Sequence, residues 1–165
     1  MIFADRRDAG RQLADLVAQK IQGTGLVLGI PRGGVVPAKI VADKLGWPLN
    51  VLAAKKIGAP GNPELAVGAK VKPTSLRVSG LSVILVDDGI ATGQTMAAAI
   101  NWLRGHGAKQ VIVAVPVCAQ DTAGRLKPLV DRWICLHEAA DMMAIGQFYE
   151  EFGQVSDEEV LQLLA

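Results

Sequence analysis

The sequence is poor in cysteine and in aromatic residues. Its 165 residues include only two cysteines, Cys118 and Cys135, and both lie inside apolar runs. Two distant thiols cannot form a disulfide framework, and with the two histidines, His106 and His137, they do not have the spacing of a zinc site. Aromatic residues make up 4% of the chain, whereas 18 residues are glycine. We therefore expect an aliphatic core joined by glycine-rich turns, with both thiols reduced.

The chain also lacks a large charge of one sign and long hydrophobic runs. Its 17 basic and 16 acidic residues leave a formal charge of +1, which argues against a broadly basic nucleic-acid-binding protein. The apolar runs break after about six residues, far short of the roughly 20 that a membrane helix needs. The first 12 residues contain no apolar signal core. We expect a cytoplasmic protein with no membrane partner.

Half of the residues are hydrophobic and 20% are charged, a composition that excludes an intrinsically disordered chain. The length suits one domain over residues 1–165, and no tandem repeat is present. Short aliphatic runs alternate with helical patterns, as in a mostly parallel sheet covered by helices on both faces. The predicted fold class is therefore α/β, with about five strands.

The predicted strands are residues 26–30, 49–54, 82–86, 111–117 and 133–136. The predicted helices are an N-terminal helix through 13–21 capped by Asp5 or Asp8, then 35–45, 92–104 and 121–127, and a last one through 164 with Ser156 and Glu159 as a capping box. Two segments do not fit this alternation. Residues 57–80 are interpreted as mainly a long loop with at most a short strand at 65–71, and residues 137–153 as irregular.

Polar and glycine-rich segments follow three of the predicted strands: PRGG at 31–34, Lys55-Lys56, and DDGIATGQT at 87–95. Ligands bind beyond the carboxyl ends of parallel strands, so these segments should meet at one edge of the sheet. The third leads directly into a helix, whose N-terminal amides suit an anion. It is neither a Walker A motif nor a dinucleotide fingerprint. Its adjacent carboxylates, Asp87 and Asp88, suit a ligand that also carries hydroxyls or Mg²⁺, such as a phosphorylated ribose.

Residues 83–95, VILVDDGIATGQT, resemble the motif that binds 5-phosphoribosyl 1-pyrophosphate (PRPP) in type I phosphoribosyltransferases. The PRGG segment after the first strand resembles the pyrophosphate loop of that family. Segments 3–14, 55–69 and 148–160 resemble a bacterial group of phosphoribosyltransferases whose acceptor is unassigned. The resemblance therefore extends over most of the chain.

The resemblance implies a Rossmann-like fold and Mg²⁺-dependent transfer of the phosphoribosyl group to a nitrogenous base, with release of pyrophosphate. Catalysis would involve Arg32, Asp87 and Asp88, and the two carboxylates would hold the ribose hydroxyls directly or through Mg²⁺. The full set implied to bind PRPP is Arg32, Gly33, Gly34, Lys55, Lys56, Asp87, Asp88, Gly89, Ile90, Ala91, Thr92, Gly93, Gln94 and Thr95.

Two features refine this implication. The 6-oxopurine enzymes of the family have an aspartate where this chain has Ala91, which weighs against hypoxanthine or guanine as the acceptor. Family members also close a flexible loop over the reaction centre, and residues 69–80 are short for such a lid. A non-catalytic regulator that binds PRPP or a nucleotide on the same fold is therefore an alternative function. A regulator that binds RNA or DNA is a third possible function, which the near-neutral charge disfavours. The oligomeric state is left open, with a homodimer as one alternative.

Several of these residues also have purely structural interpretations. Asp87 and Asp88 could cap the following helix, and one of Lys55 and Lys56 is expected to be solvated because successive strand residues face opposite sides. Phe148 and Tyr149 either form an aromatic hood over a base or belong to the core. The thiol of Cys118 is expected to be a core group and not a nucleophile.

Overall fold

Five parallel strands form the central sheet, in the order β2-β1-β5-β6-β7. The computed structural model describes the backbone of all 165 residues and every side chain except those of residues 62–67. The α/β class and the five-stranded parallel sheet predicted from the sequence are confirmed. In sheet order the strands are β2 (Leu49–Val51), β1 (Leu26–Gly29), β5 (Ser82–Val86), β6 (Gln110–Ala119) and β7 (Arg132–Ala139).

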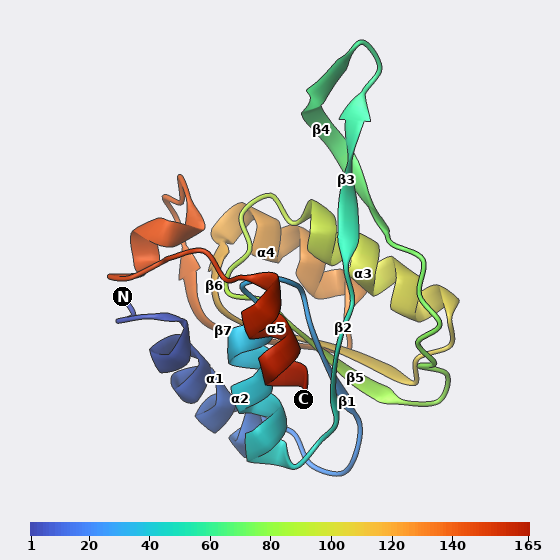
Figure 1. Ribbon diagram of the computed structural model, residues 1–165, viewed down its shortest axis with the longest axis vertical. Coiled ribbons are helices and arrows are strands. Elements are labelled where there is room, and N and C mark those ends of the chain that lie inside the picture. The colour runs from blue at the N-terminus through green and yellow to red at the C-terminus, as the bar shows by residue number, and fades with distance from the viewer.

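Helices cover both faces of this sheet, as the aliphatic strands predicted (Figure 1). Alternate side chains of a strand point to opposite faces, so neighbours in β5 enter different cores. Ile84 packs with α1 and α2, whereas Leu85 packs with α3 and α4. The four helices are α1 (Arg6–Lys20), α2 (Val35–Leu45), α3 (Gln94–Gly105) and α4 (Gln120–Leu126).

Local capping signals set the helix boundaries. Asp5 is the N-cap of α1, and its carboxylate accepts a hydrogen bond from the backbone N–H of Asp8 at 2.8 Å. A last helix, α5 (Asp157–Leu164), follows Ser156, whose hydroxyl accepts from the N–H of Glu159 at 3.0 Å. Side chains that accept from first-turn amides stabilise helix starts, which is why these boundaries could be predicted. No helix in the described chain is long and apolar enough to cross a bilayer.

The prediction of mainly a loop over residues 57–80 was wrong up to residue 71, where the expected short strand at 65–71 is part of a longer one. Residues 54–71 form an antiparallel hairpin, β3 (Ala54–Ala59) and β4 (Asn62–Val71), which projects from the body of the molecule (Figure 1). Glycine has low strand propensity, and two register shifts adjoin Gly58, so the alternation that marks a strand is broken here. Each strand forms its hydrogen bonds with the other, and the pattern of one strand alone does not predict that pairing.

Other boundaries also moved. The second strand ends at Val51, so Lys55 and Lys56 lie in β3 and not directly beyond the sheet. The predicted irregular segment after residue 137 contains the end of β7 and a short 3₁₀ helix, η2 (Ile145–Phe148). The chain near residue 3 pairs with the residues after η2, because the N–H of Phe3 donates to the carbonyl of Phe148 at 2.8 Å. The N-terminal segment is thus joined to residues 148–151.

Candidate functional site

The glycine-rich loop at residues 89–95 connects the end of β5 to the start of α3. Ile90 anchors it to β6, since its N–H donates to the carbonyl of Val117 at 3.0 Å and its carbonyl accepts from the N–H of Ala119 at 2.9 Å. α3 starts after Gly93, which provides no side-chain cap. The first turn of a helix leaves N–H groups without intrahelical acceptors, so this uncapped end suits an anion.

α4 supports this loop from behind. Gly93 has a φ of +80°, and a Cβ there would lie 2.6 Å from a methyl group of Thr122. The hydroxyl of Thr122 donates to the carbonyl of Ala91 at 2.5 Å. The guanidinium of Arg125 donates to the carbonyl of Thr92 at 3.2 Å. These bonds turn loop carbonyls toward α4 and hold the loop in one conformation.

The loop lines a cavity of about 130 Å³. Lys56 of β3 and Asp87, just past β5, bring one ammonium and one carboxylate to its wall, and Ile145 of η2 adds an apolar side. A larger hollow of about 430 Å³ along the hairpin shares Lys56 with it, but neither carboxylates nor the helix end reach that hollow among the described side chains. Opposite charges and an uncapped helix end therefore meet only in the smaller cavity of the two. The loop residues that line it are Gly89, Ile90, Ala91, Thr92, Gly93, Gln94 and Thr95, with Met96.

The segment after β1 approaches the two carboxylates very closely. A Cβ on Gly34 would lie 2.8 Å from Oδ1 of Asp87, and one on Gly33 would collide with Oδ2 of Asp88. Only glycine permits this approach of backbone to carboxylate. Burial, followed by the charge of Asp88, raises the pKa of Asp87 well above its usual value. A cation bound beside Asp87 would oppose that shift.

Asp88 is held by the protein itself. Its carboxylate accepts from Nε of Arg6 at 2.8 Å, and the two side chains are only 10% and 13% exposed, respectively. Its backbone carbonyl accepts from the hydroxyl of Tyr149 at 2.6 Å. The segments near residues 6 and 149 therefore both meet the loop at Asp88.

The phosphoribosyl transferase domain family matches residues 4–148 of this sequence. The chain belongs to this family. Two Mycobacterium tuberculosis relatives, provisionally named as phosphoribosyl transferases, are 38% identical over 205 positions that include 99% of this chain and 46% of theirs. The chain thus spans about half the length of those relatives. The chain has 165 residues and the alignment has 205 positions, so at least 40 positions are occupied in the relatives and are gaps in this chain.

Other relatives support the same placement. An adenine phosphoribosyltransferase of Mycobacterium marinum is 35% identical, over 75% of this chain and 71% of that protein. The crystal structure of TT1426 from Thermus thermophilus has 35% identity and a TM-score of 0.87, with 99% of this chain and 98% of that chain covered. A purine phosphoribosyltransferase structure from Pyrococcus horikoshii, at 22% identity and a TM-score of 0.62, covers 92% of this chain and 93% of its own. It shares the phosphoribosyl transferase fold.

The structure brings most of the residues of the predicted PRPP site together, but not all of them. Residues 33–34, Asp87 and the loop 89–95 converge with Lys56 at one edge of the sheet. Arg32 follows a cis peptide bond, is half exposed, and has its guanidinium 3.6 Å from the carboxylate of Asp157. Lys55 does not line the cavity. Both lysines are exposed, and of the two only Lys56 lines this cavity.

Phe148 and Tyr149 do not form an open hood in this structure. They are 8% and 6% exposed and pack with Phe3, so the core interpretation applies to both rings. The hydroxyl of Tyr149 is used by Asp88, and its ring stacks on Phe152 at 4.9 Å. Cys118 is buried as expected, and burial raises the pKa of its thiol to about 12, which disfavours the reactive thiolate.

Sequence reasoning missed the residues that support the site from elsewhere in the chain. Arg6, Thr122 and Arg125 bond to residues 88–92 from other elements, and Tyr149, expected over a base or in the core, bonds to Asp88. The only available signal was that segments 3–14 and 148–160 each resembled family members. Local patterns do not reveal that such segments meet, because their contacts span as many as 147 residues of sequence.

The side chains at this site could hold Mg²⁺ only if a bound ligand supplied further oxygen atoms to coordinate it. No group of three or more histidine, cysteine, aspartate or glutamate side chains that could hold a metal occurs among the described residues. Asp87 reaches the cavity, whereas Asp88 is occupied by Arg6. Mg²⁺ is commonly held by one or two carboxylates together with substrate phosphates and water, which suits a single carboxylate beside an anion site.

Proposed function

We propose that this domain binds PRPP at the cavity of residues 89–95 and transfers its phosphoribosyl group to a nitrogenous base. The observation that carries this proposal is the uncapped N-terminus of α3, which opens into a cavity that also holds Asp87 and Lys56. An amide-rich anion site beside a carboxylate matches a sugar phosphate, whose phosphate and hydroxyls need opposite partners. Family membership supports the same chemistry.

The side chains have distinct roles in this proposal. The N–H groups of the loop 89–95, with the hydroxyls of Thr92 and Thr95, hold the 5′-phosphate. Asp87 accepts hydrogen bonds from a ribose hydroxyl. The backbone of residues 33–34 faces the pyrophosphate, and Lys56 supplies positive charge. Arg32 reaches the pyrophosphate by leaving Asp157, a step that costs little because an exposed pair 3.6 Å apart is weak.

The reaction is a displacement at the anomeric carbon of the ribose. The bond from that carbon to the pyrophosphate oxygen breaks with its electron pair on the oxygen, and a base nitrogen forms the new bond with its lone pair. The nitrogen then loses its proton to solvent or to the released pyrophosphate. Asp87, together with the pyrophosphate, would hold Mg²⁺, and the ion would supply positive charge that offsets the charge of the leaving group. The domain contributes mainly by holding phosphate and ribose in position while charge develops.

An amino-substituted base such as adenine is the first acceptor to test. Ala91 stands where the 6-oxopurine enzymes have an aspartate, and a relative at 35% identity is named as an adenine phosphoribosyltransferase. Neither observation excludes other bases.

A non-catalytic role as a sensor of PRPP or a nucleotide is the second candidate. The short segment 69–80 favours it, because a lid that closes over the reaction centre would need additional residues. The cavity of residues 89–95 would then bind its ligand and leave it intact.

The test is calorimetric titration of the protein with PRPP, with and without Mg²⁺, followed by a pyrophosphate-release assay across purines and pyrimidines. Saturable binding is expected, strengthened by Mg²⁺ and reduced at least about tenfold in Asp87→Asn. Release of pyrophosphate with a base would establish the transferase, whereas binding without release would establish the sensor. If millimolar PRPP gives no heat and no protection against thermal unfolding, the proposal is wrong.

A further inference from the structure

The two carboxylates at the end of β5 have different surroundings although they are neighbours in sequence. Asp87 lines the cavity of residues 89–95, whereas Asp88 is only 7% exposed and is not among the described residues that line it. Oδ2 of Asp88 accepts from Nε of Arg6 at 2.8 Å. The pair is therefore asymmetric before any ligand binds.

Arg6 is itself fixed on three sides. Its Nε donates to Asp88, its Nη1 donates to the carbonyl of Gly153 at 2.6 Å, and its guanidinium lies 3.9 Å from the centre of the Phe152 ring. A guanidinium that forms directed hydrogen bonds and stacks on an aromatic ring has little freedom to leave. Asp88 therefore has a permanent cation.

The backbone around this ion pair approaches it closely. A Cβ on Gly33 would collide with Oδ2 of Asp88 and lie 2.9 Å from Nε of Arg6. The N–H of Asp88 donates to Oδ1 of Asp87 at 2.8 Å, and its carbonyl accepts from Tyr149. The ion pair thus joins α1 to the end of β5, and the Tyr149 hydrogen bond joins the segment after η2 to the same residue.

We propose that Arg6 is a positioning residue: it reserves Asp88 for the protein, so that Asp87 alone of the pair meets the bound sugar or cation. The part that concerns the sugar rests on the proposed function, but the division between the two carboxylates does not. Without the charge of Arg6, two uncompensated carboxylates would stand side by side and attract a divalent cation even in the absence of a sugar phosphate.

The experiment measures Mn²⁺ binding to the protein by electron paramagnetic resonance, with no PRPP present. Arg6→Gln is expected to bind Mn²⁺ at least about tenfold more tightly than the wild type, because it removes the competing cation. Arg6→Lys, which keeps a positive charge, is expected to stay near the wild type. Arg6→Gln combined with Asp88→Asn is expected to lose the gain. A residue with a merely structural role would not increase affinity for a cation when replaced.

Thermal unfolding of the same variants measures whether each one folds and how stable it is. Arg6→Gln is expected to raise the unfolding equilibrium constant by about 100-fold, because it leaves a buried carboxylate without its partner, and the double variant is expected to recover part of that loss. If Arg6→Gln folds but binds Mn²⁺ no better than the wild type, the proposal is overturned. If Arg6→Gln does not fold, the proposal still predicts that Arg6→Gln combined with Asp88→Asn folds. If neither variant folds, the proposal is overturned as well. Because no arm uses PRPP, these outcomes are independent of whether the proposed transferase function holds.

Discussion

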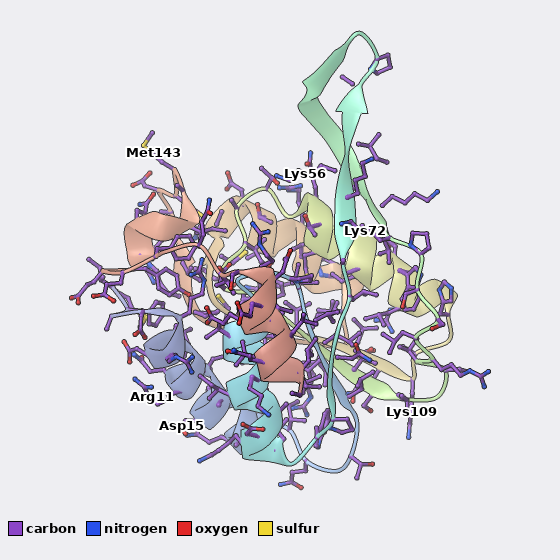
Figure 2. All side chains as sticks on the ribbon, viewed as in Figure 1. Arg11, Asp15, Lys56, Lys72, Lys109 and Met143 are labelled. Carbon is purple, nitrogen blue, oxygen red and sulfur yellow. The ribbon has the colours of Figure 1, made fainter. Side chains whose placement is uncertain are left out.

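Lys55 and Lys56 are adjacent, identical residues with different surroundings. In the β3–β4 hairpin Lys55 pairs with Lys70 and Lys56 with Ala69, so their side chains leave opposite faces. Lys56 lines the cavity of residues 89–95, and Figure 2 shows it near the root of the hairpin. Strand alternation predicted that one of the two would be only solvated, whereas both are exposed, and the difference is that Lys56 alone also lines this cavity.

We therefore expect Lys56→Ala to weaken PRPP binding by about three- to tenfold, because it removes a partly exposed cation from the anion site. Lys55→Ala is the matched control and should change the dissociation constant less than twofold. Calorimetry at two salt concentrations would check this, since the Lys56 effect should shrink as salt screens the charge. Equal losses in both variants would contradict the assignment.

At the scale of elements, the loop 89–95 and α4 act as one unit. Gly93 combines a positive φ with close contact to Thr122, whose hydroxyl holds the loop at Ala91. The motif in the sequence was sufficient to identify the loop and the helix after it. The support from α4 was not predictable, because Thr122 and Arg125 read as ordinary residues of a short helix.

Gly93→Val is expected to lower the free energy of unfolding by about 2 kcal/mol and to abolish PRPP binding, because a β-branched residue is strained at that φ and would meet Thr122. Gly124→Ala in α4 is the control. An added Cβ there meets nothing within 4 Å, so this helix substitution should be stabilising by about 0.5 kcal/mol and leave binding intact. Chemical denaturation and calorimetry would measure both. Normal binding by Gly93→Val would show that the loop is not the phosphate site.

The hairpin is the element that sequence reasoning interpreted wrongly. Glycines at 58 and 68 weaken the strand pattern, and the register shifts beside Gly58 break its period. Strand formation here depends on a partner across the turn and on packing of β4 against α3, where Val71 joins the core. Neither contact is encoded by the local pattern of residues 57–80.

At the scale of the whole molecule, the two thiols report on global unfolding. Cys118 is fully buried, and burial raises its pKa to about 12 and that of Cys135 to about 11. At pH 8 both should then be thiolates in at most about one molecule in a thousand, compared with about a quarter for a free cysteine. Their reactivity is therefore suppressed by folding.

We expect alkylation of both cysteines in the native protein at pH 8 to be at least about 100-fold slower than in denaturant. The rate should rise with pH up to the raised pKa values and should follow the fraction of unfolded chain as denaturant is added. Mass spectrometry of iodoacetamide-treated samples would resolve the two sites. Rapid native labelling of Cys118 would mean that β6 is open to solvent.

The sequence by itself determined the α/β class, the parallel sheet, the capped helices and the loop 89–95. These features depend on short-range signals: aliphatic periodicity, side chains that cap helix starts, and glycines at fixed spacing before a helix. Each is readable because the residues that cause it lie within one element or one turn.

The tertiary structure decided which of the candidate residues meet. It brought Arg6 to Asp88 and Tyr149 to the same residue, turned Lys56 toward the cavity and Lys55 away, and placed Arg32 beside Asp157. These contacts join segments up to about 125 residues apart, and they follow from how helices and strands pack, not from local preference. The residues that give Asp87 and Asp88 different surroundings could therefore be found only in the folded chain.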